Sequence, residues 1–279
     1  MDFISLPDQE NLILGTSGTE KHRIGFWDSK APERVEGSRY TFEDLHRLLL
    51  QNNRLDFLIV SGHSTAKGGE EQGVPNEAKH IMGGNFSDLQ YIPDLISHFA
   101  FTLSRNQDTN GSVSSKVAIL PDIYLSADEA KAHNLILLGT GNVNWVTEHV
   151  FRHFWENAHV LPIHFKSMST DDVIVSELSA KEYSLPPLSH GEEDYGILEM
   201  VPNPWNPEKV AVLCCGIDLW GTQAATLALC RADLNNNKHN HLYPAKVLSV
   251  RLEKANTVGF SGHTLNLRKI AGDGITFLE

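Results

Sequence analysis

Short apolar segments alternate along the chain with segments of helical periodicity. The apolar run at Leu55–Val60 is typical of a buried parallel strand, and further strands are expected at Lys116–Leu120, Leu135–Leu138 and Val210–Cys215. Between these runs, apolar residues recur every three or four positions, which predicts helices. The expected helices cover residues 41–52, 85–103, 126–133, 144–154 and 222–233. The pattern predicts an α/β fold, Rossmann-like, with a mainly parallel sheet and helices on both faces.

The most informative stretch is Asn134–Phe154, in which a short strand, a polar loop and a helix follow one another. Backbone N–H groups at a helix start have no partner within the helix, and the helix dipole adds positive charge there. An anionic or polar ligand is therefore expected at this loop. The loop reads G-x-G-x-x-N, with Asn144 where the dinucleotide motif has glycine, and no acidic residue ends the next strand. Ribose recognition is unsupported, and a purely structural turn is the alternative.

The remaining pattern sets the domain boundaries. Asn11–Thr16 is expected to be a first strand, and Tyr195–Val201 another, followed by a rigid turn at 203–207. Residues 1–234 are expected to form the α/β domain, which two βα halves (about 1–133 and 134–234) could compose. An Asn- and His-rich linker precedes residues 242–279, where Val247–Leu252 and Leu265–Ile270 alternate like paired strands. They predict a C-terminal β hairpin or small β appendage.

Charge and cysteine content limit the partners and the cellular location that we expect. The net charge of −12 argues against a general nucleic-acid or anionic-membrane surface, which would need clustered Lys and Arg. Neither a signal peptide nor an apolar run of membrane-spanning length is present, so no membrane partner is expected. Three cysteines make no disulfide framework, and a cytoplasmic location is predicted.

Polar, glycine-bearing loops are expected where the parallel strands end, because open α/β sheets bind ligands at the carboxyl ends of their strands. These loops supply the candidate ligand-binding residues. They are Ser61, Gly83, Gly84, Asn85, Gly139, Thr140, Gly141, Asn142, Asn144, Gly216, Gly221 and Thr222. The cofactor is unidentified, and a nucleotide-like ligand is the class that such loops fit.

Four side chains near these loops could carry chemistry. His63 and Ser64 could act as base and nucleophile, although their segment is not a G-x-S-x-G motif, and a polar loop that touches ligand is the alternative. Cys215 is a nucleophile if a helix start lowers its pKa, and otherwise a small buried hydrophobe. Asp218 could bind ligand hydroxyls or a cation, or cap its loop. No metal site is predicted, because the spacing of Cys230 and the nearby histidines fits no zinc motif.

Three segments carry a family resemblance. They read DYGILE at Asp194–Glu199, NPWNPEK at Asn203–Lys209, and Cys-Gly followed by Gly-Thr-Gln-Ala-Ala within Cys215–Ala225. The pattern resembles the Rossmann-like module of archaeal S-layer-type proteins and related soluble bacterial proteins. Gly139–Asn144 would match that family's glycine-rich strand end, and Gly83–Asp88 its glycine-bearing helix start. The resemblance spans residues 80–230 and implies a fold with a binding cleft, but no catalytic residue.

Three functions follow from these observations. The first is binding of a small nucleotide-like or polar anionic ligand, with a sensing or assembly role. The second is a hydrolase or nucleotide-processing enzyme that uses the same cleft. The third is a structural interaction scaffold of the S-layer-like type. The expected partner is a small molecule, and a homo-oligomer is left open.

Overall fold

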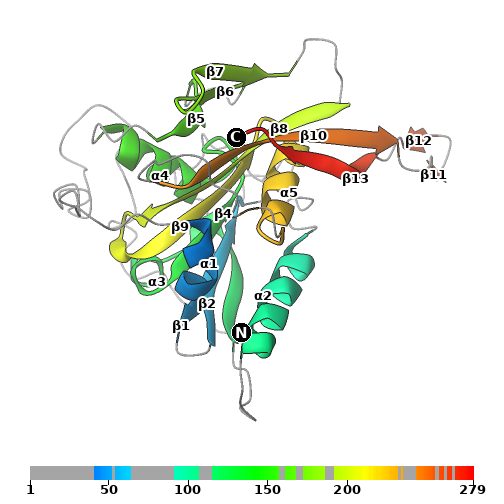
Figure 1. Ribbon diagram of the computed structural model, residues 1–279. Coiled ribbons are helices and arrows are strands. Elements are labelled where there is room, and N and C mark those ends of the chain that lie inside the picture. The colour runs from blue at the N-terminus through cyan, green and yellow to red at the C-terminus, as the bar shows by residue number, and fades with distance from the viewer. Residues whose placement is uncertain are drawn as a thin grey trace.

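An eight-stranded sheet runs through the centre of the molecule in a computed structural model (Figure 1), which describes residues 41–51, 54–63, 91–106, 115–156, 161–167, 172–185, 192–231, 234, 243–254, 258–260, 263–265 and 268–279. The strand order is β1-β2-β4-β9-β8-β10-β13, and β3 pairs with β2. The strands are β1 (Leu50–Gln51), β2 (Arg54–Ser61), β3 (Ser115–Pro121), β4 (Asn134–Leu138), β8 (Glu193–Asn203), β9 (Asn206–Gly216), β10 (Ala245–Lys254) and β13 (Arg268–Phe277).

The sheet is mixed, so the prediction of a mainly parallel Rossmann-like sheet was wrong. Strands β3, β2, β4 and β9 run parallel to one another in neighbouring positions. In contrast, β1 runs antiparallel to β2, and β9, β8, β10 and β13 alternate in direction. Antiparallel pairings therefore outnumber parallel ones by four to three.

A tight turn explains why the antiparallel half begins at β9. β8 ends at Asn203 and β9 starts at Asn206, and the Asn203 side chain accepts the backbone N–H of Trp205 at 2.9 Å. Parallel neighbours need a crossover of roughly a dozen residues or more, so a connection this short can join only antiparallel strands. The turn itself was predicted, but its consequence for strand direction was not.

The C-terminal strands also correct the predicted fold class, because they belong to the main sheet and not to a small appendage. β10 pairs with β8, and β13 pairs with β10. Val247 and Leu248 of β10 are fully buried in the two opposite cores of the sheet. Between these strands, β11 (Val258–Phe260) and β12 (His263–Leu265) pair as a separate hairpin.

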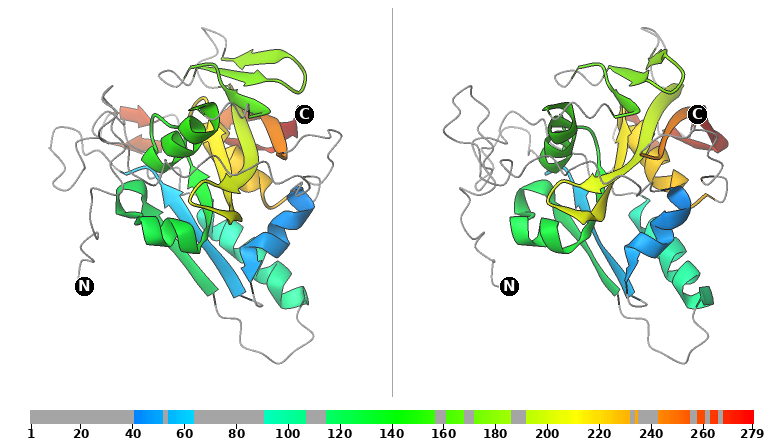
Figure 2. Two further views of the ribbon diagram at one scale, coloured as in Figure 1. Left: turned by 90° about the vertical axis from the view of Figure 1, so that its left-hand side faces the viewer. Right: turned by 60° about the vertical axis from the view of Figure 1, so that its left-hand side comes forward.

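Different layers cover the two faces of the sheet (Figure 2). One face packs against α1 (Phe42–Leu49), α2 (Ile92–Asn106) and α5 (Leu219–Ala228). The other carries α3 (Ala127–Ala132), α4 (Trp145–Glu156) and a three-stranded antiparallel sheet of β5 (Ile163–Phe165), β6 (Val173–Ser176) and β7 (Lys181–Ser184). Helices alone therefore do not cover this second face.

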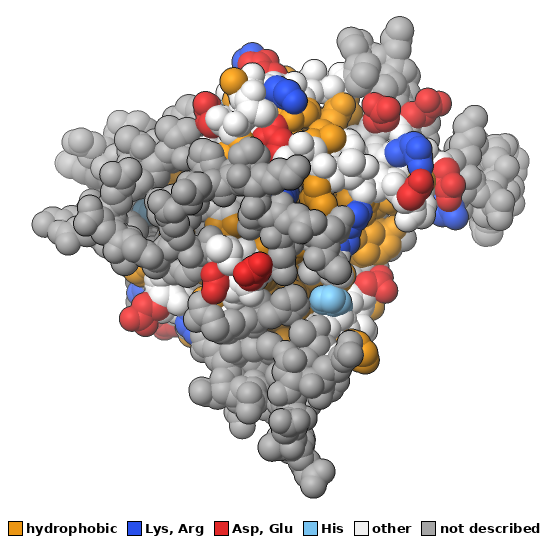
Figure 3. All heavy atoms as spheres, in the orientation of Figure 1, with side chains coloured by type: hydrophobic (Ala, Val, Ile, Leu, Met, Phe, Trp, Pro, Cys, Tyr) orange, Lys and Arg blue, Asp and Glu red, His pale blue; other side chains and the backbone are white. Residues whose placement is uncertain are grey.

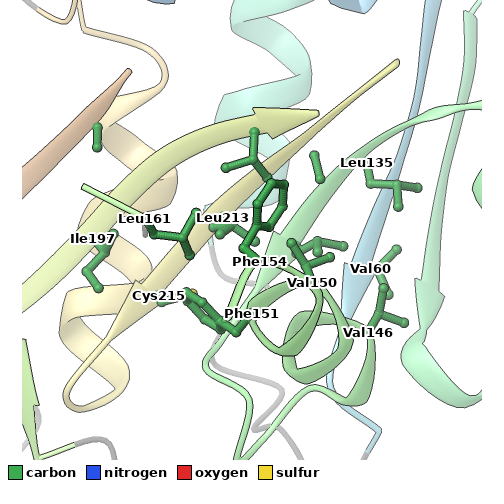
Figure 4. Packing of buried hydrophobic residues seen from close by; sticks show 14 of the residues in the cluster. Val60, Leu135, Val146, Val150, Phe151, Phe154, Leu161, Ile197, Leu213 and Cys215 are labelled. Atoms are coloured by element: carbon green, nitrogen blue, oxygen red, sulfur yellow. The ribbon is translucent and has the colours of Figure 1, made fainter. Parts of the chain in front are cut away.

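The strand that precedes α4 shows how the sequence builds both cores. Ile136 and Leu138 face the core beneath α1, α2 and α5, whereas Leu135 and Leu137 face α4. Because both faces are covered, the strand is apolar at every position. Figure 4 shows Val146, Val150, Phe151 and Phe154 projecting from α4 into the second core.

Helix starts follow their capping residues. Ser126, the first residue of the helix expected at 126–133, caps α3 and forms a capping box with Glu129. α5 begins at Leu219 with Asp218 as its cap, so it starts three residues before the helix expected at 222–233. Pro93 occupies the first turn of α2, where its missing N–H leaves no helix bond unmade.

Some predicted elements lie outside the described residues, namely the strand at Asn11–Thr16 and the helix start at Gly83–Asn85. No described helix is both long enough and apolar enough to span a membrane. On the face shown in Figure 3, acidic and basic side chains are mixed over β10 and β13, where Arg251 pairs with Asp273 and Lys269 with Glu253.

Candidate functional site

The carboxyl ends of β3, β2, β4 and β9 lie side by side, because these strands are parallel neighbours. The chain leaves them through Asp122, through Gly62–His63, through Gly139–Asn144 and through Ile217–Gly221. We call these four exits the rim. The structure therefore brings together the predicted loops at Ser61, at Gly139 and at Gly216, at the edge where open α/β sheets bind ligands.

Asp122 ties three of the four exits together and is fully buried. Its Oδ1 accepts the backbone N–H of His63 at 2.9 Å and that of Ile123 at 2.8 Å. The same oxygen lies 2.9 Å from Nδ1 of the His63 ring. Its Oδ2 accepts the N–H of Trp145, the first residue of α4, at 2.6 Å. Because this Oδ1 already accepts two backbone N–H groups, we assign Nδ1 of His63 as the donor, and the contact fixes the orientation of the ring.

Asn144 has a structural role that uses its whole side-chain amide. Its Oδ1 accepts the N–H groups of Val146 and Thr147 at 3.0 and 3.2 Å, which caps α4. Its Nδ2 donates to the carbonyl of Val60 on β2 at 2.9 Å and to that of Leu138 on β4 at 3.0 Å. These bonds join α4 to two adjacent strands, which matches the structural role that the sequence analysis gave as the alternative to ligand contact.

The start of α4 is therefore neutralised from within the protein. The N–H of Trp145 is bonded to Asp122, and those of Val146 and Thr147 are bonded to Asn144. From the sequence, we expected an anionic ligand to bind these N–H groups. Asp122 already holds the position of that anion, so an external phosphate would have to displace it.

The start of α5 repeats this arrangement with Asp194, which is 1% exposed. Its Oδ2 accepts the N–H of Gly221 at 2.5 Å, and its Oδ1 accepts those of Tyr195 and Asp218 at 2.7 and 3.2 Å. Burial raises the pKa of Asp194 to about 7, although these backbone donors lower it, and the nearby charge of Asp218 adds to the rise.

Asp194→Asn tests this environment through the pH dependence of stability. Asp194 has a raised folded pKa, so the folded state keeps a proton that the unfolded chain loses above about pH 4. Its contribution is full below that pH and is lost as pH rises to about 7. In urea unfolding from pH 4.5 to 8, the stability of the wild type relative to the variant should fall by a few kcal/mol from the acidic to the alkaline end. A difference that grows with pH would show that the three donors hold Asp194 ionised.

Close backbone packing accounts for the glycines around α5. A Cβ on Gly221 would lie 2.1 Å from the carbonyl oxygen of Tyr195, and one on Gly216 would lie 2.3 Å from the backbone nitrogen of Thr222. Gly196 is equally crowded, with its Cβ position 2.5 Å from the Gly221 oxygen. Gly216 and Gly221, predicted to bind ligand, let α5 rest directly on β8 and β9.

Cys215 is fully buried beside Phe151 in the core under α4 (Figure 4). Its Sγ donates to the carbonyl of Gly139 at 3.3 Å. β4 separates β2 from β9, so these strands lie about 10 Å apart. The His63 ring is turned to Asp122 on the opposite side of β2 from β4. The structure therefore does not bring Cys215 and His63 together.

The other chemical candidates are placed as follows. Asp218 is exposed, and its side chain accepts the N–H of Leu219 at 2.8 Å as the cap of α5. Burial raises the pKa of Cys214 and raises that of Cys230 to about 11, which disfavours either thiolate. Ser64 lies outside the described residues.

The remaining predicted ligand residues divide between the rim and the interior. Ser61 and Thr140 are buried at the ends of β2 and β4, and Thr222 is buried in α5. Gly139 has φ of +91°, in the left-handed region that favours glycine. Gly141 and Asn142 are half-buried in the same loop. Gly83, Gly84 and Asn85 lie outside the described residues.

Sequence reasoning missed Asp122 and Asp194 as site residues. Each had a signal: Asp122 directly follows the predicted strand at 116–120, and Asp194 precedes the apolar run of β8. An aspartate that directly follows a parallel strand lies at the rim whatever the strand order is. Among the described residues, no group of three or more His, Cys, Asp or Glu side chains is arranged to hold a metal ion.

Comparison of the chain with protein-family models, with curated proteins and with solved structures finds no match. The resemblance to the S-layer-type module stays a prediction. Functional inference consequently rests on the geometry of the rim.

Proposed function

We propose that the protein binds a small polar or anionic ligand at the rim, with His63 as the main recognition group, and that binding serves a sensing or assembly role. The observation that carries this proposal is the buried His63–Asp122 pair at the exits of β2 and β3. Asp122 holds the imidazole in one orientation at the edge of the sheet where ligands of open α/β sheets bind.

We expect the ligand to be bound by side chains and not by the backbone N–H groups that the glycine-rich loop suggests. The amides that begin α4 are bonded to Asp122 and Asn144, and those that begin α5 include the N–H of Gly221 bonded to Asp194. A protonated imidazole donates a charge-assisted hydrogen bond to a phosphate or carboxylate oxygen. Because Asp122 fixes the ring beforehand, less conformational entropy is lost when a ligand binds.

Binding fits the described residues better than hydrolysis. The His63–Asp122 geometry would also suit a general base, which needs a nucleophile within hydrogen-bond reach. Cys215 lies two strands away in the opposite direction, and Asp218 caps α5. A hydrolase at this rim stays the alternative, and turnover of a generic phosphoester that His63→Gln abolishes would favour it.

The test is a thermal-shift panel of nucleotides, sugar phosphates and small carboxylates. A ligand at 100 times its Kd adds about 2.7 kcal/mol, which raises the Tm of a chain this size by about 5–10 °C. His63→Gln should lose most of that shift. His133→Gln is the matched control, because His133 forms a similar pair with Asp56 near the opposite ends of β2 and β4. An equal ligand response in wild type and His63→Gln would refute the assignment.

A further inference from the structure

The three-stranded sheet β5–β6–β7 lies beyond α4 on the second face of the main sheet (Figure 1). Its inner side chains are buried, among them Ile163, Phe165 and Ile174. The ring of Phe165 meets that of Phe151 of α4, with 6.0 Å between centroids. Apolar packing therefore docks this small sheet, but two acidic side chains at the same junction need another explanation.

The first acid, Glu199, lies in the core beneath the small sheet. It is fully buried, and Leu213 of β9 and Ala245 of β10 are its cross-strand neighbours. Neither of its carboxyl oxygens has a hydrogen-bond partner of normal geometry among the described residues. Burial raises the pKa of Glu199 well above its ordinary value, and the N–H of Ile163 in β5 offsets that rise only in part. A carboxyl group in this position is stable only while it keeps its proton.

No described charge compensates an ionised Glu199. Lys246 of β10 alternates to the opposite face, where its Nζ lies 5.7 Å from the centroid of the Phe277 ring. His164 of β5 lies 3.3 Å from Glu177, on the outside of the small sheet. The other titratable groups on β8, β9, β10 and α4 include Glu193 and Asp194 of β8, Glu208 and Lys209 of β9, Arg251 and Glu253 of β10, and Glu148, His149, Arg152 and His153 of α4.

The second acid, Glu279, follows β13 of the main sheet and is half-buried where it meets the small sheet. Its carboxylate accepts hydrogen bonds from the hydroxyls of Ser176, Ser179 and Tyr183 on or next to β6 and β7. Burial alone would raise the pKa of Glu279, but these three hydroxyls, with Lys181 nearby, outweigh it and lower the pKa. This contact requires the ionised carboxylate.

We propose that the three-stranded sheet is a pH-sensitive flap, held against the main sheet by neutral Glu199 beneath it and by ionised Glu279, which bonds the hydroxyls of Ser176, Ser179 and Tyr183. The two acids respond oppositely to pH, so docking is strongest in mildly acidic solution, where Glu199 keeps its proton and Glu279 has lost its own. The inference does not depend on the ligand proposed for the rim.

The signs follow from the two environments. For Glu199, the stabilisation is full below the unfolded pKa, near 4.5, and is lost as pH rises through the raised folded value. For Glu279, the stabilisation is present above the unfolded pKa and is lost as pH falls through the lowered folded value. The flap therefore loosens toward alkaline pH through Glu199 and toward strongly acidic pH through Glu279.

The flap also borders the rim. The ring of Tyr183 on β7 lies 5.6 Å, centroid to centroid, from that of Tyr195 on β8. The backbone of Tyr195 in turn accepts the N–H of Ile217 at 3.0 Å, at the exit of β9. Loosening of the flap would consequently remove the contact between Tyr183 and Tyr195. Through this contact, the pH response of the flap would reach the rim.

Hydrogen exchange of the amides in 163–165 and 173–184, corrected for the chemical exchange rate at each pH, tests the proposal. Wild-type opening should rise at least about tenfold between pH 5.5 and 8.5, since each 1.4 kcal/mol of lost docking is tenfold. Glu199→Gln keeps the shape and hydrogen-bonding capacity of the protonated acid but cannot ionise, so its opening should change less than about twofold.

Glu279→Gln should instead open faster than wild type at pH 5.5, by about threefold or more, because it loses charge-assisted bonds. The matched control is Glu182→Gln on β7, which removes an exposed pair with Lys166 and should behave like wild type. Exchange in the wild type that is flat from pH 5.5 to 8.5, or that rises equally in Glu199→Gln, would overturn the proposal. The wild-type profile decides the matter even if a variant fails to fold.

Discussion

Asp122→Ala is expected to lower the free energy of unfolding by about 3–5 kcal/mol, because it removes one partner of a buried polar cluster. The change leaves the backbone N–H groups of His63, Ile123 and Trp145 without their acceptor, and it frees the His63 ring. Each buried donor left unmade costs about 1–3 kcal/mol. Urea unfolding at neutral pH measures the loss.

Two further variants show whether the cluster causes this loss. Asp172→Ala, at an exposed position just before β6, should change stability by less than about 0.5 kcal/mol. Asp122→Asn keeps the size of the side chain but turns one acceptor into a donor that faces an N–H group, so it should fall between wild type and Asp122→Ala. A loss of under 1 kcal/mol in Asp122→Ala would mean that water or other groups satisfy these amides.

Gly221→Ala is expected to cost at least about 3 kcal/mol, at or beyond the upper end of ordinary overpacking. The added methyl group would lie 2.1 Å from the carbonyl oxygen of Tyr195 and 2.7 Å from the Cα of Gly216, both in the backbone of the central sheet. A strand in the middle of a sheet cannot shift without breaking its ladder, so α5 must move away from β8 and β9. Chemical denaturation and near-ultraviolet circular dichroism would report the loss of stability and of packing.

The chain offers a matched control for this substitution in Gly272→Ala on β13, because a Cβ at Gly272 would meet no atom within 4 Å. That variant should stay within about 0.5 kcal/mol of the wild type. If Gly221→Ala were as stable as Gly272→Ala, α5 would not rest on β8 as closely as described. That result would favour the ligand-binding role that was predicted for Gly221 from the sequence.

Local elements were predictable from the sequence because each is set by its own residues. Ser126 and Glu129 specify the start of α3, and the uniform apolar run Leu135–Leu138 specifies a strand covered on both faces. Strand direction was predicted wrongly for β8, since it depends on the connections between strands. The short connection Asn203–Asn206 can join only antiparallel strands, but the neighbouring glycine motifs led us to predict parallel strands.

From the sequence, we could predict that the loops of the candidate site lie together at one edge of the sheet, but not which contacts their residues make. The polar exits of β2, β4 and β9 do meet at one edge, which follows from the parallel order of these strands. What their glycines do depends on tertiary contacts that periodicity does not reveal. Asn144 has both sides of its amide bonded, and Gly221 packs on a carbonyl group. Sequence reasoning therefore treated as ligand contacts some residues that hold helices onto strands.

Asp122 and Asp194 bond the backbone N–H groups at the helix starts of the rim. Each is a buried carboxyl group that accepts the N–H at or near the start of the helix following a parallel strand, the position that an anionic ligand holds in many α/β proteins. The positive ends of α4 and α5 are thereby used within the fold. The proposed function therefore assigns ligand recognition to side chains at the exits, of which His63 is the one that Asp122 orients.

An experimental structure with the ligand that responds best in the thermal-shift panel tests this account most directly. The account predicts ligand density within hydrogen-bond distance of the His63 ring, with Asp122 still bonded to the N–H of Trp145. Density on the backbone N–H groups of residues 145–147, with Asp122 displaced, would contradict it, and so would a ligand bound away from the rim.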